Sequence, residues 1–222
     1  SIRCDVYESN VNWDSSHALV GGYRTGIYGG NNSYRRTLYS HVNINAPVYY
    51  DKEKEYFATV YGAGYGKDTW AQYTEVNLNN TARVYEVYGG GQLGRVMNKK
   101  SVDAWAAEAN AAATATYTAA HTDWEALSEE DKATTPEPQA PHAIELSLGT
   151  GYIDNGLDDK WAEARNGKRY NTNVLINEGA DVCGYMYNGS LSGAYAYGGG
   201  LGDAKTPNTG DVHGTTYIAL LG

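Results

Sequence analysis

The chain has 222 residues, a net charge of −9 and no run of Lys or Arg longer than two residues, which argues against a general attraction to nucleic acid or anionic membranes. No stretch approaches the ~18 consecutive apolar residues of a membrane-spanning helix, so we expect no membrane insertion. The 21 tyrosines and 27 glycines, against one phenylalanine and two methionines, favour a β-rich, repetitive structure.

The chain starts at Ser1 without a basic-then-apolar leader, so we expect a processed protein or a piece of a longer one. Its two cysteines, Cys4 and Cys183, are too few for a disulfide framework. A single bridge between them and two free buried thiols are both compatible with the sequence.

Two short motifs alternate along most of the chain. The first is a tyrosine-glycine phrase, at 27–30, 60–66, 87–94 and 196–202. The second alternates apolar and polar residues with the period of a half-buried strand, at 40–45, 74–79, 172–177 and 215–220. Residues 1–26 carry only a degenerate form of the repeat, and the first full repeat begins at Ile27. Two motifs in fixed order, four times over, predict a repeat protein.

Alignment of the repeats produces columns of apolar residues. The first column is Val42, Val76, Val174 and Ile218, the second is Ile44, Leu78, Ile176 and Leu220, and the third is Val48, Val84 and Val182. Such columns fit strands stacked in parallel with their apolar side chains inside. The sequence therefore predicts an all-β fold with a helical insertion, namely a right-handed parallel β-solenoid (β-helix) of about four coils.

Polar and aromatic residues also recur at fixed places in the repeats. Asn45, Asn79 and Asn177 end three of the strand phrases, and stacked amides can hydrogen-bond to one another as a ladder. One tyrosine of each first motif would form an aromatic stack: Tyr28, Tyr61, Tyr88 and Tyr197. We interpret all of these residues as structural.

Residues 95–143 interrupt the repeat with an alanine-rich segment. We expect one helix to begin at Ser101, whose hydroxyl is suited to cap it, and a second to begin at Thr122, which has capping-box spacing. The helical excursion covers about 101–133, and a stiff proline-rich linker follows at 135–141. The segment is predicted to be a helical hairpin inserted into the third coil.

Residues 144–222 complete the expected domain. They contain a predicted strand at 144–148, a predicted short helix at 158–165, and the remaining coils from Tyr170. Together with the coils in 1–94, we expect them to form one domain that carries the insertion.

Signals for a metal or cofactor are weak. Asp154, Asp158 and Asp159 have the ligand types of a calcium loop but lack EF-hand spacing. The five histidines form no His-x-x-His or His-x-x-x-His pair, and the cysteines form no Cys-x-x-Cys. We therefore predict no metal, no cofactor and no catalytic residue.

Two glycan-related functions remain as alternatives. A polysaccharide-cleaving lyase or hydrolase would need paired carboxylates, but Glu75 shares its column with His41 and Asn173 rather than with a second acid. A glycan-binding protein would use exposed tyrosines and tryptophans as stacking platforms. Nucleophile-elbow, phosphate-loop and dinucleotide motifs are absent from the sequence.

The repeat phrases at 87–91, 196–202 and 74–79 give the chain a family resemblance. It resembles the glycine-rich β-helix repeats of adhesin-like and autotransporter-like surface proteins of anaerobic bacteria. The resemblance covers roughly half of the chain and leaves out 1–26 and 95–170. It implies an extracellular or cell-surface protein without a cofactor.

The last repeat suggests how such a protein would associate. Tyr217, Ile218, Leu220 and Leu221 lie in a core strand that no further repeat follows, and Leu221 stands where the other repeats have asparagine. An open strand edge with apolar columns needs a cover. We therefore expect a non-enzymatic structural or adhesive protein whose edge is covered by the next copy, head to tail, or by further coils of a longer chain.

Overall fold

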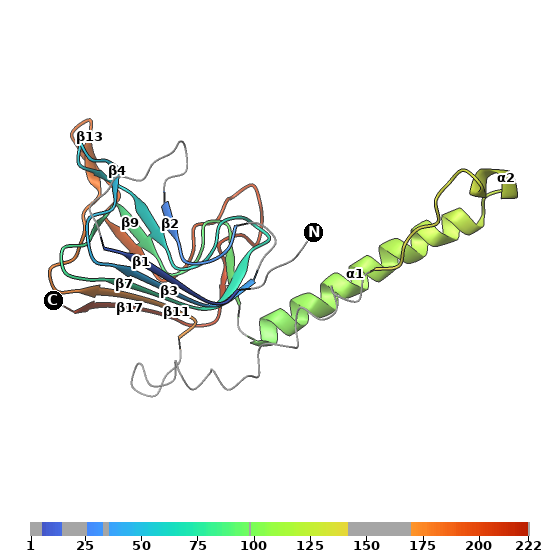
Figure 1. Cartoon of the computed structure of the whole chain (residues 1–222), viewed down its shortest axis with the longest axis horizontal. Coiled ribbons are helices and arrows are strands. Elements are labelled where there is room, and N and C mark those ends of the chain that lie inside the picture. The colour runs from blue at the N-terminus through green and yellow to red at the C-terminus, as the bar shows by residue number, and fades with distance from the viewer. Residues whose placement is uncertain (1–5, 15–25, 33–35, 98, 142–169, 222) are drawn as a thin grey trace. The chain divides into compact units, whose positions relative to one another are not determined.

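The computed structural model describes residues 6–14, 26–32, 36–97, 99–141 and 170–221 (Figure 1). The fold is mainly β, with parallel sheets and two helices, which confirms the predicted β class. The chain divides into two compact units, one of 1–98 with 159–222 and one of 99–158.

The first unit contains a large parallel sheet. Its main strands neighbour one another in the order β1 (Val6–Trp13), β3 (Arg36–Ile44), β7 (Trp70–Leu78), β11 (Thr172–Asn177) and β17 (Thr216–Leu221). Two short strands, β10 (Arg95–Met97) and β16 (Val212–His213), pair with each other, and β10 also pairs with the start of β7. We call residues at matching register across the main strands a row.

A small parallel sheet lies in the same unit. It consists of β2 (Gly26–Tyr28), β6 (Thr59–Tyr61), β9 (Glu86–Tyr88) and β15 (Tyr195–Tyr197), in that order. A third pair is formed by β8 (Arg83–Val84) and β12 (Asp181–Val182), which are also parallel. The chain visits the large and small sheets alternately, which explains why the two sequence motifs alternate.

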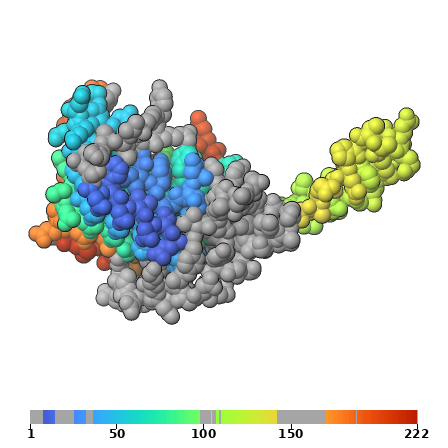
Figure 2. Space-filling view, in the orientation of Figure 1, coloured from blue at the N-terminus to red at the C-terminus, as the bar shows by residue number. Residues whose placement is uncertain are grey.

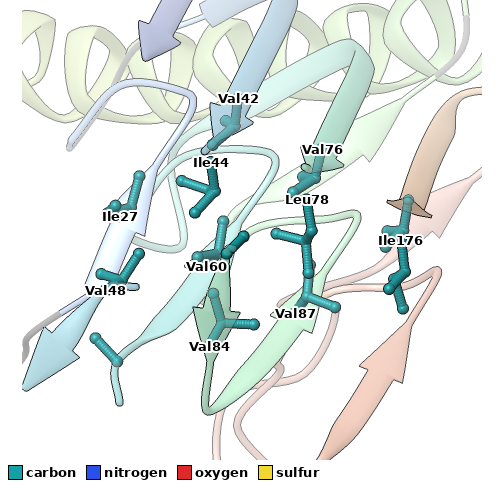
Figure 3. Close-up of a cluster of buried hydrophobic side chains, with 13 residues drawn as sticks. Ile27, Val42, Ile44, Val48, Val60, Val76, Leu78, Val84, Val87 and Ile176 are labelled. Atoms are coloured by element: carbon teal, nitrogen blue, oxygen red, sulfur yellow. The ribbon is translucent and has the colours of Figure 1, made fainter. Parts of the chain in front are cut away.

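The core of this unit is built from aliphatic side chains of all these sheets (Figure 3). Val42, Ile44, Val76, Leu78 and Val174 are fully buried residues of the large sheet. The small sheet contributes Ile27, Val60 and Val87, while Val48 and Val84 come from the third predicted column. Alternate residues of each strand point into this core, as the period of two requires.

Two antiparallel hairpins extend this unit. They are β4 (Tyr49–Asp51) with β5 (Tyr56–Phe57), and β13 (Tyr185–Tyr187) with β14 (Ser190–Ser192). The Tyr56 and Tyr185 rings meet at a centroid distance of 4.5 Å, and Tyr85 stacks on Tyr185 at 5.1 Å. Aromatic contacts therefore join the two hairpins, although more than a hundred residues separate them in the chain.

One strand of the large sheet is interrupted by the second unit. Arg95 and Val96 of β10 pair with Trp70 and Ala71 of β7, and Thr172 of β11 pairs with Thr74 of the same strand. The Asn171 carbonyl accepts a hydrogen bond from Thr74, which places Asn171 beside position 73. Consequently β10 and β11 together match the length of β7, although about 70 residues of chain separate them.

The second unit contains α1 (Lys99–Glu125) and α2 (Glu129–Lys132). The predicted helix starts are wrong. Ser101 lies inside α1, and Thr122 lies in its last turn, where its hydroxyl donates to the Thr118 carbonyl at 2.8 Å. The real start of the second helix is capped by Ser128, whose Oγ accepts from the Asp131 amide at 3.2 Å.

The proline-rich segment packs along α1 rather than forming a free linker (Figure 1). The Trp124 indole N–H donates to the Thr135 carbonyl at 2.9 Å. His121 Nε2 lies 3.3 Å from Glu137 Oε1, and Lys132 Nζ lies over the Trp124 ring at 5.4 Å. These contacts hold the end of α1, α2 and residues 135–137 against one another.

Candidate functional site: the edge strand β17

The last strand of the large sheet is the place where the repeat rows reach solvent. β17 pairs in parallel with β11, with Val174 opposite Ile218 and Ile176 opposite Leu220. Within the part of the chain that the structure describes, β11 is its one partner. β17 therefore presents an open edge of backbone N–H and C=O groups.

Apolar side chains along β17 are exposed, although their row neighbours are buried. Ile218, Leu220 and Leu221 have exposed fractions of 43%, 75% and 54%. Val174 is fully buried in the row of Ile218, and Ile176 is buried in the row of Leu220. Tyr217 is half-buried, and its ring lies 5.0 Å from that of Tyr170. The exposure begins abruptly at the last strand.

The last strand of the small sheet along the chain also carries exposed apolar residues. Tyr195 and Tyr197 lie on β15, the edge strand of the small sheet, and Leu201 follows it in the chain. Six of the nine large hydrophobic residues found exposed in the described residues therefore lie on β15, β17 or the loop between them. Such a concentration marks an interaction surface better than scattered apolar residues do.

The predicted asparagines form a hydrogen-bonded ladder. The Asn177 amide donates to Asn79 Oδ1 at 2.6 Å, Asn79 donates to Asn45 at 3.0 Å, and Asn45 donates to Asp14 at 2.6 Å. Leu221 pairs with Asn177 in the next strand, so the ladder ends there. Every amide donates toward the preceding strand, and the ladder has a defined direction.

A second asparagine ladder, which was not predicted, lies on the same face of the large sheet. Asn77 Nδ2 donates to Asn43 Oδ1, and Asn43 Nδ2 donates to Asn12 Oδ1, both at 3.0 Å. The alternation of Asn43 and Asn77 with apolar residues could have revealed it. Asn12 was missed because it lies before the region that we aligned.

A row of hydroxyl groups was also missed. Ser40, Thr74 and Thr172 are buried, and their hydroxyls donate to the carbonyls of Gly62, Gly89 and Gly198 at 2.5 to 2.6 Å. Each hydroxyl donates to the glycine that directly follows the next strand of the small sheet along the chain. Thr216 occupies the same row on β17 and is exposed.

The tyrosine stack lies along the small sheet. Consecutive rings of Tyr28, Tyr61, Tyr88 and Tyr197 are stacked at centroid distances of 4.9, 5.0 and 4.7 Å. Burial raises the pKa of Tyr61, with smaller contributions from Tyr28 and Glu86. Burial also raises the pKa of Tyr88, whose hydroxyl donates to Glu86 Oε2 at 3.0 Å. Burial therefore keeps Tyr61 and Tyr88 neutral to a higher pH than an exposed tyrosine.

Glu75 is the carboxylate that a cleaving enzyme would use. It lies opposite His41 and Asn173 on the neighbouring strands, and its Oε1 accepts a hydrogen bond from Asn77 Nδ2 at 2.9 Å. His41 Nε2 lies 3.5 Å from Glu8 Oε1. Glu75 therefore has a hydrogen-bonded polar neighbour on its own strand, and the groups opposite it in the sheet are an imidazole and an amide.

Several predicted features lie outside the described residues: the calcium-loop candidates Asp154, Asp158 and Asp159, Cys4, the strand at 144–148 and the helix at 158–165. Among described residues no group of three or more His, Cys, Asp or Glu side chains is arranged to hold a metal ion. No described helix combines the length and apolar character needed to cross a membrane. Cys183 is a half-buried free cysteine.

Comparisons with known proteins found no match: neither a family model, nor a curated protein, nor a solved structure is similar to this chain.

Proposed function

We propose that the protein is a non-enzymatic structural or adhesive protein, folded as a right-handed parallel β-solenoid of about four coils. The observation that carries the proposal is the set of matched rows, which run through five parallel strands and end on an exposed apolar edge at β17. A structure of this kind lengthens by adding strands in the same register. We further propose that a second copy of the chain covers the edge.

An extracellular or bacterial cell-surface location belongs to the same proposal. It rests on the resemblance of the glycine-rich phrases to repeats of surface adhesins. The net negative charge and the two asparagine ladders on the face of the large sheet are compatible with a protein surrounded by water. The proposal requires no cofactor, no nucleic acid and no insertion into a membrane.

Self-association is tested by electron microscopy and sedimentation of the 222-residue chain over a range of concentrations. We expect fibres whose mass rises with concentration. Replacing Ile218 and Leu220 together by lysine is expected to abolish them, because charged residues block edge pairing. Tyr50→Lys is the matched control, since Tyr50 is an exposed large residue on the hairpin strand β4. Monodisperse monomers at every concentration would overturn the proposal and favour further coils of a longer chain as the cover.

A glycan-binding or polysaccharide-cleaving protein is the second candidate function. Exposed Tyr50 and Tyr195, on different β strands, are the observation that favours binding, because exposed rings can stack on sugars. Binding on a glycan array that Tyr50→Ala or Tyr195→Ala abolishes would support this candidate. Release of sugars from a polysaccharide, lost on replacement of Glu75 by Gln, would instead support cleavage.

A further inference from the structure

The two outer strands of the large sheet carry the same order of residues facing the core. We infer that β1 of a second copy adds in parallel to β17, with Ser9 beside Thr216, Val11 beside Ile218 and Trp13 beside Leu220. This inference rests on the proposed self-association and specifies its second surface and its register.

The evidence is the continuity of three rows across all five strands. The hydroxyl row is Ser9, Ser40, Thr74, Thr172 and Thr216; the first apolar row is Val11, Val42, Val76, Val174 and Ile218; the second is Trp13, Ile44, Leu78, Ile176 and Leu220. β1 thus repeats the pattern of β17, although residues 6–13 precede the first full repeat recognised in the sequence.

Both strands are at an edge within the described chain. β1 pairs with β3 alone and β17 pairs with β11 alone among the strands that the structure describes. Asn10 and Asn12 of β1 are exposed, and Figure 2 shows part of β1 (dark blue) on the molecular surface. Val11 and Trp13 are only partly buried against the core, so their rows also remain open on this side.

Parallel addition fits the rows better than a symmetric contact between two β17 strands. All pairings in the large sheet are parallel, and each aligns the hydroxyl row and the two apolar rows that face the core. An antiparallel pair of β17 strands would reverse the order, so Thr216 would no longer meet another hydroxyl. The parallel contact uses two different surfaces of the molecule, and its repetition produces an open fibre rather than a closed dimer.

Disulfide trapping tests this register. The outward-facing row partners Asn12 and Ala219 form one in-register cysteine pair, and Asn10 and Tyr217 form another. Neighbouring strands lie about 4.8 Å apart, which is within the Cα distance that a disulfide spans. All variants are full-length chains in which Cys4 and Cys183 are replaced by serine.

The same four substitutions recombine into matched off-register controls. Asn12→Cys with Tyr217→Cys, and Asn10→Cys with Ala219→Cys, shift the partners by two residues and separate the Cα atoms by about 8 Å, beyond disulfide reach. We expect mild oxidation to produce a ladder of covalent multimers from both in-register pairs and none from the recombined pairs. Circular dichroism checks that each variant keeps its β content, and the second pair replaces the first if one fails to fold.

Three results would overturn the inference. Equal cross-linking of in-register and recombined pairs would show that no fixed register exists. A covalent dimer from Ala219→Cys alone would show that two β17 strands meet. Fibres visible by microscopy in all variants without any cross-link would show that another surface than β1 covers β17, while leaving the proposed self-association intact. Particles of monomer mass in the unmodified chain would instead overturn the proposed function itself.

Discussion

Replacing Thr74 by valine tests whether the buried hydroxyl row holds the two sheets together. Thr74 is fully buried and its hydroxyl donates to the Gly89 carbonyl at 2.5 Å. Valine keeps the shape of threonine but removes the donor, which leaves a buried carbonyl without this partner. Such a loss costs about 1–3 kcal/mol of the free energy of unfolding. For a chain of this size, that corresponds to a fall in Tm of about 2–12 °C.

Thr216→Val is the matched control, because Thr216 lies in the same row and is exposed. We expect it to change the free energy of unfolding by less than about 0.5 kcal/mol. The assay is urea unfolding followed by circular dichroism, at a protein concentration low enough to keep the chain monomeric. A shifted midpoint with an unchanged m-value would identify a change in stability. Equal losses in the two variants, or no loss at Thr74, would refute the role assigned to the buried row.

Three further predictions concern other parts of the chain. Gly62→Ala is expected to lower the free energy of unfolding by about 1–3 kcal/mol, because a Cβ at this position would overlap the Gly89 carbonyl oxygen. Gly199→Ala is the control in the same urea assay and is expected to be tolerated, since a Cβ there meets no atom within 4 Å. Burial raises the pKa of Tyr61 above the usual 10.0, so the contribution of this neutral side chain to the free energy of unfolding is complete below pH 10 and is lost as pH rises further. Between pH 8 and higher pH, the urea midpoint of Tyr61→Phe should therefore fall less than that of the unmodified chain. Deleting 99–158 is expected to leave the β unit folded, as judged by its β circular dichroism and cooperative unfolding. Loss of either would contradict the division of the chain into two compact units.

The parallel sheets could be anticipated from sequence because identical environments select similar residues. Val42, Val76 and Val174 each pack into the same core from the same register, and so the same residue type recurs. The amide ladder follows the same logic, since Asn45 and Asn79 hydrogen-bond to each other only when they are aligned. Repetition made these features visible without any knowledge of the tertiary structure.

Other features depend on contacts that have no repeating signature. β1 was missed because tryptophan at position 13 replaces the aliphatic residue of the other strands and no recognisable glycine phrase precedes it. The start of α2 was misplaced because Thr122 has the right spacing for a cap, yet α1 continues through it and Ser128 is used instead. Capping preferences are weak compared with helix continuation through an alanine-rich segment.

The edge itself could be predicted only in part. Leu221 in an asparagine position indicated that the last strand differs from the others, and the exposure of Leu220 is consistent with that difference. The sequence did not show that β1 offers a matching set of residues, because that match becomes visible only when β1 is placed beside β3.

The order of the strands in the large sheet has a mechanical consequence. In the described chain the main strands pair one after another from β1 to β17, so a pulling force applied between these two strands passes through every pair. Matching positions on β3 and β7 are separated by 34 residues of chain. If that pair and the β2–β6 pair between the same two repeats both separate, this length of chain is released and extends by about 110–120 Å, at 3.3–3.6 Å per residue. Under tension we therefore expect the protein to lengthen in discrete steps of this size.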